Sequence, residues 1–517
     1  MPRCRPKPRS MRAALSHMRW LFVAVACVVL SGQIAVARQD EQTFAMRVLL
    51  KGLQTALADE ASAGFSAAAL VQAAGLSSYV TPDRTQMAFV QPAVARINSD
   101  PVVAQRLDLR LALTLIAQSY GAEDTYGVML AQANPEMKAL VLQRGRATLA
   151  DLRRLLDENH LPSTGTGGNL QLDVPLIVWS GATLELVPGD KLTMNRATGA
   201  FLANFGHLNM DSAEISGAGD PNPAIASFQP FVITADGGTV LVRNSRLADL
   251  GFGATINFAG FSVLRGILHT ADRQNLIQNS RFENLVSLTT NGAADILIEG
   301  NRFRDMRGSS VIIYRTLDAT LRGNVFTGKM PTNAIRLIEG SAGGRVTGNI
   351  ILGGKHAGIL VGNGSNDVRI ANNIIWRRDG GGISVLRSDC GRVSGNYVVD
   401  NRQKGIEVRV SLDTTLDGNT VLSNHNAGIW VAAQASGAQT WLSHNTLAAN
   451  DAGIAGAVGE SINLDGNDFS NQFPQFLSGD LAAQFQTIAM DLRGLKPSQL
   501  TAADSVKHKP LSANCSK

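Results

Sequence analysis

Two consecutive stretches of the sequence decide the fold: Asn349-Ile-Ile-Leu-Gly-Gly-Lys-His-Ala-Gly358-Ile-Leu-Val361 and Asn373-Ile-Ile-Trp-Arg-Arg-Asp-Gly-Gly-Gly382-Ile-Ser-Val385. Each begins with an asparagine and an apolar pair, and about nine residues later a glycine opens a short apolar run. The asparagine recurs at steps of 22 to 26 residues, as Asn279, Asn301, Asn324, Asn349, Asn373, Asn396, Asn419, Asn445 and Asn467. A period of this length is typical of solenoids, in which each repeat forms one coil.

The repeated residue types favour a parallel β-helix over a leucine-rich repeat, because the leucine spacing of that repeat is absent. Each coil is predicted to hold two or three short strands joined by tight turns. Asparagines at the same position of successive coils would stack, and their side-chain amides would form a hydrogen-bonded ladder inside the solenoid. We therefore interpret the nine asparagines as structural residues and not as a catalytic set.

Strand alternation predicts which side chains face the solvent. The residue after each strand-opening glycine points inward, as for Ile359, Ile383, Ile406 and Ile429. The next residue points outward, and residues at that position should form a column with a spacing of roughly 4.8 Å. This column contains Ile312, Arg336, Leu360, Ser384, Glu407 and Trp430. A second outward column contains Tyr314, Ile338, Gly362, Leu386, Arg409 and Ala432, and Arg315 and Arg387 lie just beyond their strand ends.

These columns combine guanidinium groups with aromatic rings. Arginine forks suit carboxylates, and aromatic faces suit sugar rings, so a linear acidic polysaccharide is the predicted partner. The predicted substrate-binding residues are Arg336, Arg387, Glu407, Arg409 and Trp430. The alternative is a solvated sheet face with scattered charges.

The chain divides into four predicted parts. Residues 1–37 are predicted to form a signal peptide, with a cationic start, an apolar run at Leu21–Leu30 and an Ala35-Val36-Ala37 cleavage site. We therefore expect export to the periplasm and no membrane span after cleavage. Residues 38–165 form an α-helical region, interpreted as a cap and spacer. Residues 166–478 form the β-helix, and residues 479–517 a C-terminal cap and tail.

Composition and charge restrict the function. Without the six cations of residues 1–37, 41 Lys and Arg stand against 42 Asp and Glu, so nucleic-acid binding loses its electrostatic basis. No metal-ligand spacing or phosphate-binding loop is present, so neither a metal nor a cofactor is predicted. Cys390 and Cys515 remain after cleavage, and the sequence leaves open whether they pair.

Several motifs resemble the periplasmic mannuronan C5-epimerases of alginate-producing bacteria. They are Pro175-Leu-Ile-Val-Trp-Ser-Gly-Ala-Thr-Leu-Glu-Leu186, Gly199-Ala-Phe-Leu-Ala-Asn-Phe-Gly-His-Leu208, Phe228-Gln-Pro-Phe-Val-Ile233, Asn244-Ser-Arg246 and Gly405-Ile-Glu-Val-Arg-Val-Ser411. The resemblance covers most of residues 170–450 and implies a right-handed parallel β-helix with an N-terminal α-helical region. That family carries an Asp-Pro-His-Asp motif on one strand. Here Tyr314 stands at the histidine position, Arg315 at the last aspartate, and Glu339 at a family arginine one coil later.

The resemblance implies a protein that modifies a uronate-containing exopolysaccharide during its synthesis or export, by C5-epimerisation or β-elimination. Both reactions remove a proton next to a carboxylate, whose charge an arginine must neutralise. Tyr314, Arg315 and His356 are the predicted catalytic residues. A non-catalytic binding scaffold of an export complex is the alternative, with other proteins of that complex as candidate partners. Glycoside hydrolysis ranks last, because it needs two suitably spaced carboxylates on the surface.

Overall fold

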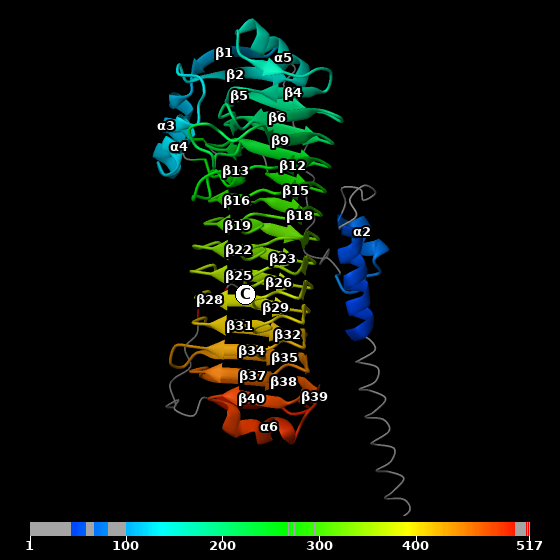
Figure 1. Cartoon of the computed structure of the whole chain (residues 1–517). Coiled ribbons are helices and arrows are strands. Elements are labelled where there is room, and N and C mark those ends of the chain that lie inside the picture. The colour runs from blue at the N-terminus through cyan, green and yellow to red at the C-terminus, as the bar shows by residue number, and fades with distance from the viewer. Residues whose placement is uncertain are drawn as a thin grey trace, which may run out of the picture.

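The structure is a computed structural model that describes residues 43–57, 67–80, 100–266, 268–269, 271, 274–293, 295–501, 513 and 515. The predicted signal peptide lies outside these residues. The chain forms a right-handed β-solenoid, which confirms the predicted fold (Figure 1). In the described part of the chain no helix is both long and apolar enough to cross a membrane.

Most coils contribute one strand to each of three parallel faces. The first face consists of β7 (Leu202–Asn204), β10 (Val232–Thr234), β13 (Gly260–Leu264), β16 (Ser287–Asn291), β19 (Val311–Tyr314), β22 (Ile335–Ile338), β25 (Ile359–Gly362), β28 (Ile383–Leu386), β31 (Ile406–Arg409), β34 (Ala427–Ala432), β37 (Ala452–Ala457) and β40 (Gln475–Gly479). The second face consists of β8 (His207–Asp211), β11 (Thr239–Arg243), β14 (Leu276–Gln278), β17 (Leu297–Glu299), β20 (Thr320–Arg322), β23 (Arg345–Thr347), β26 (Arg369–Ala371), β29 (Arg392–Ser394), β32 (Thr414–Asp417), β35 (Gln439–Ser443) and β38 (Ser461–Asp465).

The third face follows the asparagine positions. It consists of β4 (Asn169–Leu172), β6 (Lys191–Asn195), β9 (Glu214–Ala218), β12 (Arg246–Ala248), β15 (Arg281–Glu283), β18 (Arg302–Arg304), β21 (Val325–Thr327), β24 (Ile350–Leu352), β27 (Ile374–Trp376), β30 (Tyr397–Val399), β33 (Thr420–Leu422), β36 (Thr446–Ala448) and β39 (Asp468–Asn471). The short β3 (Ser163–Thr164) pairs antiparallel with β4 at its N-terminal end.

The region predicted to be helical at 38–165 also contains three strands, of which β3 is one, so it is not helical throughout. β1 (Val103–Asp108) pairs antiparallel with β2 (Lys138–Ala147), and β2 runs parallel to the long strand β5 (Leu176–Leu186), which itself pairs with β7 and β8. The physical reason is the exposed edge of β5, whose backbone groups need a partner strand. Local helix propensity gave no signal of this pairing.

Helices are also present in this region, and three of them close or cover one end of the solenoid. α5 (Leu149–Glu158) begins at a capping box made by Thr148 and Asp151, and its leucines join the interior core, so it caps the N-terminal end. α3 (Arg110–Tyr120) and α4 (Thr125–Leu130) pack on the outer side of the first face near the same end (Figure 1).

The helix at 43–57 and α2 (Ala67–Ala73) cover the outer side of the third face (Figure 1). Buried leucines of the helix, such as Leu50 and Leu53, pack with Ile374 and Trp376. Asp400 accepts hydrogen bonds from the Arg47 guanidinium at 2.6 Å and from Trp376 Nε1 at 2.9 Å. This N-terminal segment is therefore attached to coils in the middle of the solenoid.

The interior confirms the predicted inward positions. Ile359, Ile383, Ile406 and Ile429 are all buried in one continuous core. Within the same core three phenylalanines from successive coils stack, with ring centroids 5.0 Å apart for Phe282 and Phe303 and 4.7 Å for Phe303 and Phe326.

The asparagine ladder is confirmed for eight of the nine predicted members. Each side-chain amide from Asn301 to Asn445 donates to the Oδ1 of the next asparagine at 2.9–3.0 Å, and the row ends at Asn467. Asn279 is a wrong prediction, because Ser280 occupies the ladder position and its N–H donates to Asn301 Oδ1. Asn279 instead has φ 47° and aligns with Gly300, at φ 65°. Asparagine tolerates this left-handed conformation. Asn279, one residue before the ladder position, therefore fits the repeat period without belonging to the ladder.

A second ladder, which the sequence analysis did not identify, lies at the turn before the first face. The amides of Asn401, Asn424 and Asn450 each donate to the next member at 2.9–3.0 Å, and the row ends at Gln472. Two ladders therefore satisfy the polar groups of two of the turns in these coils.

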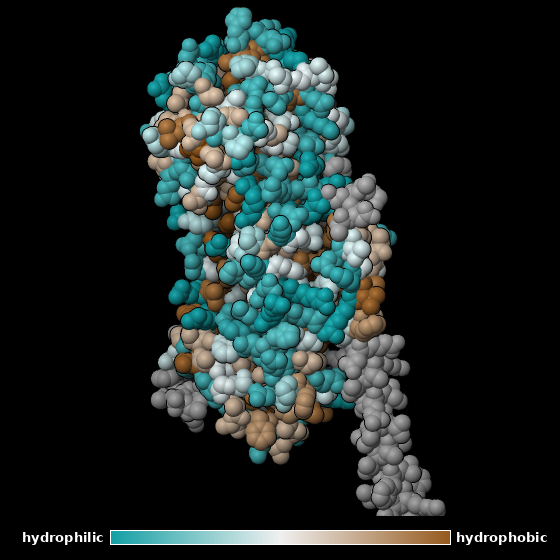
Figure 2. Space-filling model, viewed as in Figure 1, coloured by the Kyte–Doolittle hydropathy of each residue, from teal (hydrophilic) through white to brown (hydrophobic). Residues whose placement is uncertain are grey.

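The C-terminal end of the solenoid is capped by residues 480–501. A 3₁₀ helix at Ala482–Gln484, α6 (Phe485–Ala489) and β41 (Ser498–Thr501) share this segment, and β41 pairs antiparallel with β38. Leu481, Ile488 and Leu500 close the core. Figure 2 shows apolar surface gathered over this cap, whereas hydrophilic residues cover much of the middle coils. Exposed apolar residues of the cap region are Phe473, Phe485, Met490 and Leu495.

Candidate functional site

The strand register confirms both outward columns on the first face. Arg336 pairs with Ile312 on one side and Leu360 on the other, and the column continues through Ser384 and Glu407 to Trp430. The second column likewise joins Tyr314 to Ile338, and runs from Gly362 through Leu386 and Arg409 to Ala432.

The N-terminal part of the first face is covered. Phe201, Phe231 and Phe258 belong to an apolar cluster that α3, α4 and the loop before β13 complete. Near the edge of this cover, Ser262 and Thr289 both donate hydrogen bonds to the carbonyl oxygen of Ile256. Among the described residues this cover ends before β19, and the stretch of the first face from β19 to β34 is the candidate site.

Arg336, on β22, is the most unusual residue of this open stretch. Its guanidinium is half-buried between two apolar residues of its column, and burial lowers its pKa. Its Nε has no hydrogen-bond partner among the described residues. Arginine remains charged in proteins, so Arg336 presents a half-buried cation that forms no ion pair with any residue that the structure describes.

Tyr314 lies diagonally next to Arg336 on the same face, with roughly 8 Å between the Cα atoms from strand spacing and rise. It ends β19, and the Arg315 guanidinium lies 4.9 Å from the centroid of its ring. Arg315 itself follows the strand at φ 49° and is exposed. The structure thus places Arg315 against the Tyr314 ring and Arg336 on the neighbouring strand of the same face.

A polar cavity of about 510 Å³ lies at the other edge of the same face. Its walls come from the turns that precede β22, β25, β28 and β31 and from the outward side chains of these strands. The predicted residues His356 and Glu407 line it, together with Lys355, Ser384 and Lys404.

Glu407 is held by two neighbours inside this cavity. Its Oε1 accepts from Lys404 Nζ at 2.7 Å, and its Oε2 accepts from Ser384 Oγ at 3.0 Å. The same Lys404 ammonium lies 4.5 Å from the centroid of the Trp430 ring. One face of Trp430, predicted to stack on sugar, is therefore occupied by a cation.

His356 does not join Tyr314, although both were predicted to be catalytic. His356 lies in the turn before β25, whereas Tyr314 ends β19, two strands away. Opposite strand ends and two coil rises of roughly 4.8 Å each separate them, so they cannot act on the same proton. His356 belongs to the cavity, and Tyr314 to the Arg336 group.

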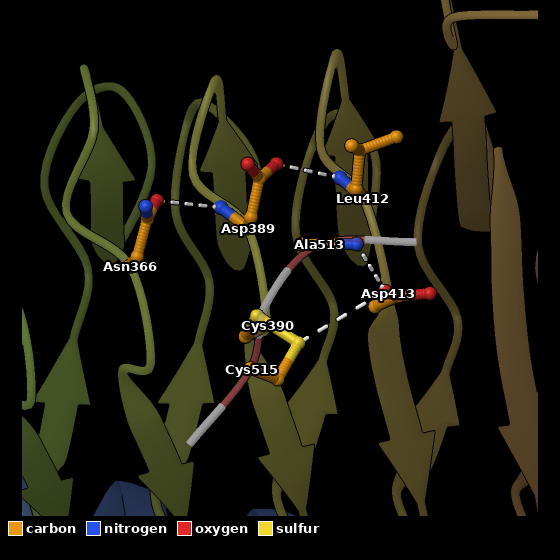
Figure 3. Close-up of a disulfide and its surroundings, with 7 residues drawn as sticks. All are labelled: Asn366, Asp389, Cys390, Leu412, Asp413, Ala513 and Cys515. Carbon is orange, nitrogen blue, oxygen red and sulfur yellow. Dashed lines mark hydrogen bonds between the residues drawn. A yellow bond between two sulfur atoms is a disulfide. The ribbon is translucent and has the colours of Figure 1, made fainter. Parts of the chain in front are cut away.

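Arg387 and Arg409 lie at the same strand ends as Arg315, three and four coils further on. Both are exposed, and their backbones are linked by a hydrogen bond of 3.0 Å from Arg387 N to Arg409 O. Beside them Cys390 forms a disulfide with Cys515, which answers the question left open by the sequence (Figure 3).

Figure 3 shows how the turns around this disulfide are joined. Asn366 accepts from Asp389 N at 2.8 Å, Asp389 accepts from Leu412 N at 2.8 Å, and Asp413 accepts from Ala513 N at 2.7 Å. The C-terminal residues are thereby attached at the edge of the open stretch.

Lys404 was missed by the sequence analysis. It precedes Gly405 in a turn, and strand alternation predicts the directions of strand residues only. The signal available was its spacing of three residues from Glu407, the spacing of their ion pair.

Comparisons with known proteins agree with this geometry. A family described as "Right handed beta helix region" matches residues 333–479. The mannuronan C5-epimerase of Pseudomonas putida is 23% identical over 313 residues, which are 57% of this chain and 59% of the relative. Mannuronan C5-epimerase AlgG of Azotobacter vinelandii is 24% identical over 315 residues, which are 56% of this chain and 58% of the relative. The chain thus spans less than two thirds of the length of these relatives.

A crystal structure of the periplasmic alginate epimerase AlgG superimposes with a TM-score of 0.61 at 16% identity, and covers 74% of this chain and 95% of that one. At this identity the match supports the fold. Together these findings confirm the predicted resemblance: the chain is a right-handed parallel β-helix protein similar, over more than half of its length, to mannuronan C5-epimerases.

Proposed function

We propose that the protein binds a uronate-containing polysaccharide along the open stretch from β19 to β34 and epimerises its sugars at C5. The similarity to mannuronan C5-epimerases supports the reaction class. The observation that carries the proposal is Arg336, a half-buried guanidinium on an open face with an unsatisfied Nε beside a tyrosine.

In this proposal Arg336 binds the carboxylate of the reacting uronate. Neutralising that charge makes the C5 proton more acidic, because the negative charge that develops on proton removal is stabilised. Tyr314 takes the C5 proton on one side of the ring, and a water molecule at this open face donates a proton to C5 from the opposite side, which inverts the centre. The proton held by Tyr314 then passes to the hydroxide that the water leaves. Arg315, over the tyrosine ring, limits the movement of that side chain.

The test is incubation of the purified protein with polymannuronate and other uronate polymers, with sugar configuration read by NMR. We expect new C5 epimers from the wild type and loss of binding and turnover in Arg336→Met. The matched control is Arg345→Met, which removes a partly buried arginine from β23 on the second face. New unsaturated chain ends would indicate a lyase instead, and no binding to any uronate polymer would refute the proposal.

A binding scaffold is the second candidate, favoured by tyrosine at the position where the resembling family has histidine. Tyr314→Phe separates the two, because it removes only the hydroxyl. An epimerase should keep its affinity and lose turnover, whereas a scaffold has no turnover to lose. We also place the protein in the periplasm, among proteins that export the polysaccharide. The Cys390–Cys515 disulfide supports an oxidising compartment.

A further inference from the structure

The wall of the polar cavity is made by turns from four successive coils, including Asn333, Lys355–Ala357, Asp379–Gly381 and Arg402–Lys404. Turns of this kind are exposed and have few core contacts, so something must fix their shape if the cavity is to recognise a ligand. The Asn333 amide holds one of them by donating to Ala357 O at 3.0 Å.

The charges in this cavity leave an excess of positive charge. Asp379 pairs with Arg402 at 3.4 Å, and Glu407 pairs with Lys404 at 2.7 Å. Lys355, which also lines the cavity and is exposed, adds a further cation. The Lys404 ammonium has three donors and uses one on Glu407, so donors remain for a ligand.

A fully buried arginine lies directly behind the wall. The Arg378 side chain donates to the backbone carbonyl oxygens of Thr332 at 2.7 Å, His356 at 3.2 Å and Ala357 at 3.3 Å, and also to those of Gly353 and Lys355. These acceptors belong to, or directly adjoin, the turns that line the cavity. A single guanidinium therefore holds two turns of the wall together.

Arg378 replaces an amide of the second ladder. Its N–H donates to Asn401 Oδ1 at 3.0 Å, as the N–H of Asn401 does to Asn424. One coil earlier the chain has Gly354, whose missing side chain leaves room for the Arg378 guanidinium. A Cβ on residue 354 would lie 2.2 Å from Arg378 Nη1. Burying an arginine costs free energy that another ladder asparagine would avoid, which points to a role beyond continuing the ladder.

We infer that this cavity binds one uronate unit of the polymer, with its carboxylate on Lys404, and that Arg378 is the positioning residue that fixes the cavity wall. The inference rests on the proposed function, because it places a recognition subsite beside the reaction site. The cavity lies at the opposite strand ends from Tyr314, so a chain that crosses the face reaches both.

The experiment is calorimetric titration of the full chain with short oligouronates at low salt, with a neutral oligosaccharide of equal length as the ligand control. We expect Lys404→Met to weaken oligouronate binding roughly tenfold, since a charge-assisted contact is lost, and to leave neutral-sugar binding unchanged. Arg378→Lys keeps the charge but not the fork of donors, and should weaken oligouronate binding and speed hydrogen exchange in the turn 353–357.

Arg307→Met is the control for Arg378, because the Arg307 side chain also donates to backbone carbonyls, those of Asn284, Leu250 and Gly251, outside the cavity. It should leave oligouronate affinity unchanged. Normal binding by Lys404→Met would refute the subsite. Weak binding by Lys404→Met with normal binding by Arg378→Lys would refute the positioning role. A wild type that binds no oligouronate would refute the proposed function itself, and the subsite with it.

Discussion

In the middle coils the first and third faces are built from equivalent strands, yet there the first face is open and the third is covered. Both send apolar residues inward at every second position. The third face also points apolar residues outward, such as Ile350, Ile374 and Trp376, and the helix at 43–57 and α2 bury them. The first face from β19 to β34 instead mixes Arg336, Glu407 and Trp430. Outward residues therefore distinguish a covered face from an open one.

The N-terminal part of the first face supports the same conclusion. There the outward residues Ile177, Ala203 and Ile233 are apolar, and α3 and α4 cover them. The change to polar and charged outward residues coincides with the end of that cover. Burial of apolar area is the main driving force for such packing, so a mixed face gains less from being covered.

The largest effect is expected from a charge on the covered face. Leu50→Asp places a carboxylate in the fully buried contact between helix 43–57 and the third face, at a cost of roughly 3–5 kcal/mol. Hydrogen exchange should then rise in residues 43–57 and remain slow in the solenoid. Phe44→Asp, at a position that is 66% exposed on the same helix, is the control. Continued protection of the helix in Leu50→Asp would show that the apolar contact does not hold it.

A substitution in the asparagine ladder tests a feature that both faces share, namely the hydrogen-bonded row of side chains inside the coils. Asn373→Ala removes an amide that donates to Asn396 Oδ1 and Val346 O, and leaves buried groups unpaired at a cost of roughly 1–3 kcal/mol. The melting temperature should fall, whereas Asn426→Ala, at an exposed turn, should leave it unchanged. Equal melting temperatures for the two variants would mean that the ladder does not support the coils.

The smallest effect is expected at the exposed edge of the open face. Arg409→Ala should weaken uronate binding by only about threefold, because solvent and salt screen an exposed cation. The residual effect should disappear as salt is added, when binding is followed by titration. A loss as large as that of Arg336→Met would mean that the polymer lies along the Arg387 and Arg409 edge and not over the central column.

The coil period, the inward isoleucines and both outward columns were predictable, because strands alternate and coils repeat. The wrong or missed predictions concern a turn, at Asn279, and the N-terminal end of the solenoid, at β1 and β2. Asn279 was placed in the ladder because asparagine suits both the ladder and the left-handed turn next to it. β1 and β2 were missed because β1 pairs with β2 and β2 with β5, and these partners lie outside the local stretch that a sequence pattern covers.

The sequence named several residues of the candidate site, such as Tyr314 and Arg336, but neither their grouping nor Lys404. Tyr314 and Arg336 meet because neighbouring coils place them on one face. His356 was separated from them by its position at the opposite strand end. Arg378 gave no signal of its role, since its five carbonyl acceptors come from two turns one and two coils earlier in the chain.

The sequence by itself determined the repeated coil and the direction of each strand residue, because both follow from local periodicities of about 23 and 2 residues. Only the tertiary structure decided which face is covered, which arginine is half-buried on the open face and which turns form a cavity. These properties depend on segments that meet from distant parts of the chain, such as Arg47 with Asp400 and Cys390 with Cys515. Side chains in turns have no fixed alternation, so their directions follow from the neighbours that the folded chain supplies.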